Sequence, residues 1–120
     1  MNDESNTDLR LRTKEFAIRV IKLYSALPKS TEAQIIGKQI LRSGTSVGAQ
    51  YREACRARSN AEFISKMQSG LQELDETSYW LELLIEGSIV KAEQLRSLQD
   101  EANQLTAIFV TSVKTAKSRT

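Results

Sequence analysis

Positions 42–58 hold a run of small residues inside what otherwise reads as one long helix, and this run constrains the fold more than any other segment. Four small residues are consecutive at 43–46, and Gly48 and Ala49 follow shortly after. A glycine in a helix interior costs about 1 kcal/mol relative to alanine. Gly44 and Gly48 therefore need a compensating gain, and the close approach of another helix backbone supplies one. The segment predicts tight packing between helices.

The rest of the chain also favours helix. It has 120 residues with five glycines and one proline, Pro28. Its apolar residues recur every three or four positions in four successive segments, which marks one buried face of each helix. Predicted loops near 28–31, 58–60 and 86–90 separate these segments. Four amphipathic helices with short connections predict an all-α protein, an antiparallel up-and-down four-helix bundle.

Capping residues mark where the helices are expected to begin, and Ser59 followed by Glu62 matches the capping-box pattern. We expect the second helix to end near Arg58. The whole chain, 1–120, is interpreted as one domain with disordered ends at about 1–7 and 116–120. The expected starts are, in order, Thr7 or Asp8, Ser30 or Thr31, Ser59, and Lys91 or Ala92.

The third segment changes its pattern between Trp80 and Ile85. Its apolar residues there spread over about 200° of the helix at 100° per residue, a wider arc than one neighbouring helix covers. This end is therefore predicted to be buried on two sides, either deep in the bundle or against another chain. The candidate oligomer interface consists of Trp80, Leu83, Leu84 and Ile85.

Charge is distributed unevenly along the chain. Residues 7–58 hold eleven Lys and Arg against four Asp and Glu, a net charge of +7. Residues 59–105 hold three against nine, a net charge of −6. This asymmetry is typical of a polyanion-binding face. It equally fits basic and acidic helices that lie side by side, within one subunit or between subunits.

The sequence offers little for catalysis. It has no histidine, the usual general base near neutral pH. Cys55 is the only cysteine and has no imidazole partner, so we interpret it as a small thiol on the packed helix face. Neither a metal-ligand pattern nor a glycine-rich phosphate loop is present. We expect no enzyme activity, catalytic residue, metal, cofactor or small-molecule substrate.

A cytoplasmic location is the simplest expectation. A single cysteine excludes an internal disulfide, so folding does not depend on an oxidising compartment. No apolar run approaches the roughly 20 residues that a membrane span needs. The first residues are acidic and polar, unlike a secretory signal.

The basic half contains a candidate nucleic-acid surface. Its arginines and lysines could contact phosphates, and Tyr51 could stack on a base. Alternatively, Tyr51 fills the core and the arginines pair with acids of the third segment. The candidate contacts are Arg42, Arg52, Arg56, Arg58, Arg19 and Lys22, with Arg10, Arg12 and Lys14 as further cations of the first segment.

Three segments carry a resemblance to a known family: Arg-Ser-Gly-Thr-Ser-Val-Gly-Ala-Gln-Tyr-Arg-Glu-Ala (42–54), Ala-Arg-Ser-Asn-Ala-Glu-Phe (57–63) and Tyr-Trp-Leu-Glu-Leu-Leu (79–84). They resemble the four helix bundle protein family, also known as the 23S ribosomal RNA intervening-sequence protein family. The resemblance implies a left-handed bundle, a homopentamer, and a bacterial cytoplasmic protein whose gene in some members lies inside a ribosomal RNA gene. It implies no established molecular activity.

The family motif maps onto a short part of the second helix. The family usually has asparagine where this chain has Gln50, and many relatives have proline where Gly48 stands. Carried over by position, the motif begins at Arg42, continues through Ser46 and Val47, and reaches Glu53 and Ala54. The helix-packing and family-motif residues of this segment are Gly44, Ser46, Val47, Gly48, Gln50, Tyr51 and Glu53. Two functions remain: an oligomer that binds RNA or another nucleic acid through a basic face, and a pentameric scaffold or adaptor that binds a protein.

Overall fold

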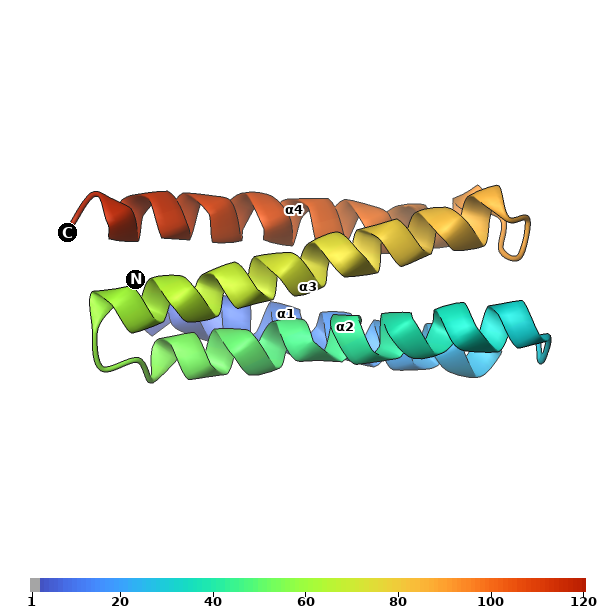
Figure 1. Cartoon of the computed structure of the whole chain (residues 1–120), viewed down its shortest axis with the longest axis horizontal. Coiled ribbons are helices and arrows are strands. Elements are labelled where there is room, and N and C mark those ends of the chain that lie inside the picture. The colour runs from blue at the N-terminus through green and yellow to red at the C-terminus, as the bar shows by residue number, and fades with distance from the viewer. Residues whose placement is uncertain (1–2) are drawn as a thin grey trace.

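Four long α-helices make up almost all of the chain (Figure 1). The computed structural model describes the backbone of residues 3–120 and the side chains from residue 8 onward. No strand occurs in this described part. The helices are α1 (Asp3–Ala26), α2 (Thr31–Cys55), α3 (Asn60–Glu86) and α4 (Ala92–Lys117). The all-α prediction is confirmed, and the three loops lie where they were expected to within about two residues.

Two serines cap the middle helices as predicted. The Ser30 hydroxyl accepts a hydrogen bond from the backbone N–H of Ala33 (3.4 Å), and the Ser59 hydroxyl accepts one from Glu62 (3.0 Å). The Glu62 carboxylate accepts from the backbone N–H of Arg58 (3.1 Å), one residue earlier than the standard capping box. These bonds satisfy N–H groups that a helix start otherwise leaves unpaired.

Two predicted boundaries are wrong by a few residues. Helix α1 begins at Asp3 rather than at Thr7 or Asp8. Helix α2 ends at Cys55 rather than near Arg58. The N–H of Arg56 donates to the carbonyl three residues back, at 3.1 Å, which tightens and ends the last turn.

Helix α4 continues to Lys117, inside the range 116–120 that was expected to be disordered. Residues 1–2 lie outside the described part of the chain. Disorder of the ends stays a prediction.

Gly87 is required because there is no room for a side chain at this position, and not because of its backbone conformation. Its φ of −81° is ordinary, and the left-handed conformation in this connection belongs to Ser88 (φ 61°). A Cβ at position 87 would lie 2.8 Å from the carbonyl oxygen of Leu83. Glycine therefore allows the chain to turn closely over the end of α3.

The helices form an up-and-down bundle with dimensions of 47 × 22 × 19 Å. Each helix lies beside the next one along the chain, and α4 returns to lie beside α1, while α1 and α3, like α2 and α4, lie diagonally across the bundle. The start of α1 and the end of α4 are at the same end of the bundle (Figure 1). The contact between α1 and α4 is the loosest of the four neighbouring pairs. The left-handed sense stays a prediction.

One core runs along the bundle and receives side chains from all four helices. Tyr51 and Phe109 meet in its interior with ring centroids 5.9 Å apart. Two of the buried polar groups satisfy each other: the Ser43 and Thr77 hydroxyls are 2.7 Å apart between α2 and α3. The largest fully buried side chains are Tyr51, Phe16, Phe109, Ile40, Met67, Leu74, Leu81, Leu84, Leu105, Val20, Val47 and Thr13.

Candidate nucleic-acid interface

The glycines of α2 bring the backbone of α1 close, as the small-residue run predicted. A Cβ at Gly44 would lie 2.7 Å from Val20 Cγ2, and one at Gly48 would lie 3.2 Å from Thr13 Oγ1. The distance at Gly44 is shorter than two carbon atoms tolerate, and the distance at Gly48 is tight enough that Thr13 would have to move by a few tenths of an ångström. Where α1 and α2 meet, a shallow groove of about 380 Å³ opens to the surface. It is lined by Thr13, Lys14, Ala17, Thr45, Gly48, Ala49 and Arg52.

Four cations lie along this part of the surface, which we call the α1/α2 basic face: Arg10, Lys14, Arg52 and Arg56. Lys14 and Arg52 both line the groove, from opposite helices. Arg10 and Lys14 are spaced four residues apart and lie on one side of α1. Arg52 lies in the last turn of α2, and Arg56, four residues later, is the C-cap residue of the same helix. Lys14 and Arg56 are exposed, and the other two are half-buried. The face therefore presents positive charge to solvent.

Within residues 8–120, no carboxylate forms an ion pair with this face. In residues 8–120 the ion pairs are Arg12–Glu101 and Lys66–Glu53, so none of the four cations takes part in one. Burial raises the pKa of the Tyr51 hydroxyl well above its usual value, and the interaction with Cys55 raises it further. The charge of Arg10 acts in the opposite direction on the same pKa. Arg10 is therefore close enough to the core to act on a buried group electrostatically.

The six predicted contact residues do not form one surface. Arg52 and Arg56 belong to the α1/α2 basic face, and Arg58 is exposed in the connection that follows it. Arg19 instead turns toward α4, where its guanidinium donates to the Ser97 hydroxyl at 2.9 Å. Lys22 is exposed on α1, near the opposite end of the bundle from Arg58. Sequence reasoning grouped these cations by charge, but the helix faces separate them.

Arg42 faces acids of its own subunit. It lines a polar cleft of about 210 Å³ between α2 and α3 together with Gln39, Ser43, Glu73, Glu76 and Trp80. Burial and the neighbouring Glu76 raise the pKa of Glu73, while the positive charge of Arg42 lowers it. Arg42 therefore faces carboxylates of α3. This agrees with the alternative prediction that the arginines lie against acids of the third segment.

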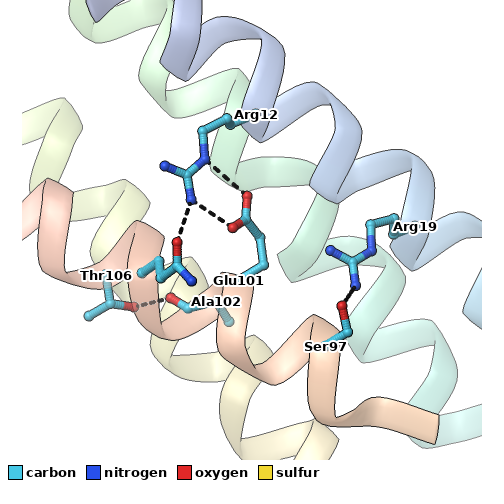
Figure 2. Close-up of polar contacts among 7 residues, drawn as sticks. Arg12, Arg19, Ser97, Glu101, Ala102 and Thr106 are labelled. Atoms are coloured by element: carbon cyan, nitrogen blue, oxygen red, sulfur yellow. Dashed lines mark hydrogen bonds and ion pairs between the residues drawn. The ribbon is translucent and has the colours of Figure 1, made fainter.

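Polar side chains bridge α1 and α4, as Figure 2 shows. The Arg12 guanidinium donates to both carboxylate oxygens of Glu101, at 2.7 and 3.1 Å, and to Gln104 at 3.1 Å. The hydrogen bond with Glu101 is the main cause of the raised pKa of Arg12. Arg12 and Arg19 thus hold α1 and α4 together instead of adding to the basic face.

The family-motif residues are mostly structural. Val47 and Tyr51 are fully buried, so Tyr51 fills the core and does not stack on a base. The Ser46 hydroxyl donates to the carbonyl of Arg42 at 2.7 Å. Glu53 forms an exposed ion pair with Lys66 at 3.4 Å. The Oε1 atom of Gln50 is buried and has no hydrogen-bond partner among the described residues.

The residues of the candidate oligomer interface are partly buried within the subunit itself. Leu84 is fully buried in the core, so the prediction that it contacts another chain is wrong. Trp80 and Ile85 are half-buried and pack against the core, and Leu83 is also half-buried. The broad apolar arc is therefore covered mainly by the bundle itself, because this end of α3 contacts neighbours on two sides.

Sequence reasoning missed a set of exposed aliphatic residues on α1. Leu11, Ile18 and Ile21 are all exposed. Their spacing of seven and three residues is also helical, but it is out of phase with the core positions of the same helix, Phe16 and Val20 among them. The signal in the sequence is a second set of helically spaced apolar residues in the first segment, on the side opposite the core positions.

The match to a known family covers most of the chain. The model of the family described as 23S rRNA-intervening sequence protein matches residues 6–111. The chain belongs to this family. Among the solved structures similar to this 23S rRNA-intervening sequence protein is a protein with unknown function from the S23 ribosomal protein family of Bacteroides thetaiotaomicron VPI-5482. It is 38% identical, with a TM-score of 0.85 over 91% of this chain and 97% of the other. No curated protein of known function matches significantly.

Two further observations describe the family member. None of its described helices has both the length and the hydropathy needed to cross a membrane. Within the described residues, no group of three or more His, Cys, Asp or Glu side chains is arranged to hold a metal ion.

Proposed function

We propose that this 23S rRNA-intervening sequence protein is a non-enzymatic, oligomeric protein of the bacterial cytoplasm that binds RNA through its α1/α2 basic face. The observation that carries the proposal is the set of four cations on this face without an ion-pair partner in residues 8–120. Unpaired surface cations are available to phosphates, and phosphate contacts supply most of the affinity of non-specific nucleic-acid binding.

Recognition would depend on backbone charge and shape. Tyr51 is buried in the core, and the exposed Tyr79 lies on α3, which is rich in acids. Neither aromatic ring is therefore on the basic face to stack on a base. The shallow groove with Lys14 on one wall and Arg52 on the other suits a phosphate chain better than a single base.

Filter binding with ribosomal RNA fragments at several salt concentrations tests the proposal. Affinity is expected to fall steeply between low and physiological salt, and the double variant Arg52→Glu/Arg56→Glu should bind weakly to all fragments and show a shallower salt slope. Arg96→Glu, a reversal of an exposed cation on α4, is the matched control and should bind like the wild type. Failure of the intact wild type to bind RNA at low salt would overturn the proposal.

We also propose that copies of the chain assemble into a homopentamer, as the family resemblance implies. A slender bundle with long open flanks supports assembly, and a ring would repeat a weak RNA contact several times and raise avidity. Light scattering at micromolar concentration tests this part. A monomer mass would contradict it without affecting the RNA test.

One observation favours the second candidate function, a pentameric scaffold or adaptor that binds a protein. Exposed aliphatic residues on α1 gain nothing from phosphate contacts, whereas a protein partner buries them. The scaffold is preferred if wild-type protein of confirmed oligomeric mass shows no RNA binding at low salt.

A further inference from the structure

Helix α1 has a second apolar stripe that the bundle leaves uncovered. We call it the α1 apolar row: Leu11, Ile18 and Ile21, which are 52%, 40% and 46% exposed. At 100° per residue the three side chains lie within about 80° of one another, on the side of the helix away from Phe16 and Val20. Three of the five exposed large hydrophobic residues in the described part of the chain are therefore in one row.

Cations flank this row. Arg10, Lys14 and Lys22 lie among or beside the aliphatic side chains, and Glu15 is an exposed acid on the same side of the helix. The net charge around the row is positive. A partner surface that fits it would be apolar along its centre and negatively charged around it.

Helix α3 of the same chain presents such a surface. From residue 67 to residue 86 it has five acids and no lysine or arginine. Its outward side carries Asp75, Tyr79, Glu82 and Glu86, which are all exposed, and we call this set the α3 acidic face. Tyr79 is 53% exposed and rests edge-on against Trp80 at a centroid distance of 5.0 Å. A large aromatic side chain is thus held in the middle of an acidic surface.

We propose that the α1 apolar row of one copy packs against the α3 acidic face of a second copy. Leu11, Ile18 and Ile21 would surround Tyr79 of the neighbour, with Lys14 and Lys22 opposite acids around them. Arg10, Arg52 and Arg56 of the α1/α2 basic face would stay open to phosphates. The inference rests on the assembly part of the proposed function and names the surfaces that make the contact. Since the two surfaces differ, the contact is heterologous, and repetition of it around an axis closes a ring.

The sizes of the two surfaces agree. From Leu11 to Ile21 the α1 apolar row extends about 15 Å, and from Asp75 to Glu86 the α3 acidic face extends about 17 Å, at 1.5 Å per residue. One flank of the bundle measures 47 by 22 Å. A stable interface buries roughly 800 Å² per partner, so residues of the flank around the two surfaces would have to join the contact.

Two variants break the two halves of the contact separately. Ile18→Glu places a negative charge where the acidic face of the neighbour would lie, and Tyr79→Arg places a positive charge where the cations of α1 would lie. Both wild-type side chains are exposed, so each variant should keep the helical circular-dichroism spectrum of the wild type while light scattering shows loss of the oligomer. Ile35→Glu changes an isoleucine that is 58% exposed on α2 and is the control that should assemble normally.

Mixing the two variants distinguishes a heterologous contact from a symmetric one. Each variant keeps one intact half, so an equimolar mixture should form a one-to-one heterodimer although each variant alone is a monomer. If only one variant loses self-association, the contact is isologous and the inference is wrong. If neither variant loses it, the assembly stands but other surfaces make it, and a monomeric wild type overturns both proposals. Ile18→Ser and Tyr79→Ser serve the same test should a charged variant melt early.

Discussion

Helix α1 packs against its two neighbours by opposite means. Toward α2 it meets the glycines at 44 and 48, so that a single added carbon would come within 2.7 Å of Val20 at the first of them. Toward α4 it is linked by Arg12 and Arg19, whose long side chains bridge to Glu101, Gln104 and Ser97 (Figure 2). The first contact depends on the absence of side chains and the second on their length.

This difference determines how each contact responds to mutation. A backbone-close contact has no room to adjust, since buried interiors are packed as densely as organic crystals. Long, partly solvated side chains can move and exchange a protein partner for water, so their loss costs little. The same small residues that bring α1 close to α2 also leave the shallow groove between Lys14 and Arg52. The small residues of α2 therefore account both for the close contact with α1 and for the groove on the candidate RNA surface.

The largest effect is expected from overfilling the glycine contact. Gly44→Leu should lower the free energy of unfolding by about 1–3 kcal/mol, because Val20 is fully buried and its branched side chain has nowhere to move. Gly44→Ala should also destabilise, despite the gain of about 1 kcal/mol in helix propensity. Urea unfolding of both variants measures the effect. If Gly44→Ala were more stable than the wild type, the glycine would only add flexibility to the helix. The α1–α2 contact would then not be tighter than the α1–α4 contact.

A smaller effect is expected at the buried hydroxyl pair between α2 and α3. The Thr77 hydroxyl donates to the carbonyl of Glu73 at 2.8 Å, so the Ser43 hydroxyl is the donor to Thr77 at 2.7 Å. Thr77→Val would leave that donor buried without its acceptor, at a cost of about 1–2 kcal/mol. Ser43→Ala should cost less, because Thr77 keeps its bond to Glu73.

A double-mutant cycle by urea unfolding measures the coupling of this pair. The double variant Ser43→Ala/Thr77→Val should be more stable than the sum of the single losses predicts. Additive losses would show that the two hydroxyls do not depend on each other.

The bridge between α1 and α4 is expected to matter less again. Arg12→Ala should cost about 0.5–1 kcal/mol, since the pair with Glu101 is bidentate but only partly buried. The loss should shrink at high salt, which screens the wild-type attraction. Unfolding at low and high salt measures both effects, with Arg96→Ala as a control cation. If Arg12→Ala lowered the free energy of unfolding as much as Gly44→Leu does, the α1–α4 contact would be as sensitive to mutation as the α1–α2 contact.

The smallest effect is expected at Glu73, and it depends on pH. Burial and Glu76 raise the pKa of this carboxyl in the folded state. Its contribution to stability is therefore present at acidic pH and is lost as pH rises through the folded-state pKa. Glu73→Gln should thus be slightly more stable than the wild type at pH 7, and the advantage should vanish near pH 4. Melting at both pH values measures this difference, with Glu93→Gln, an exposed glutamate of α4, as the control. An advantage that persists at pH 4 would contradict the assignment.

Local signals in the sequence were sufficient to predict the four helices and two of their caps. Apolar spacing, Pro28, Ser30 and Ser59 act over one or two turns of chain, so their consequences can be read locally. The small-residue run also predicted a close helix contact correctly, because glycine in a helix interior has few other uses. Boundaries at Asp3 and Cys55 were missed, because the energies that decide a last turn are small.

Which charges have partners could not be predicted from the sequence, because it depends on how the helices pack together. Arg42, Arg19 and Arg52 belong to one basic half of the sequence, yet the first faces acids of α3, the second bonds to α4, and the third lines an open groove. Leu84 and Ile18 are both apolar helical residues, but one is in the core and the other is exposed. These differences arise from the rotation of successive side chains around each helix axis. Each residue turns a helix by 100°, so the side that faces a neighbour depends on how the helices dock across the whole bundle.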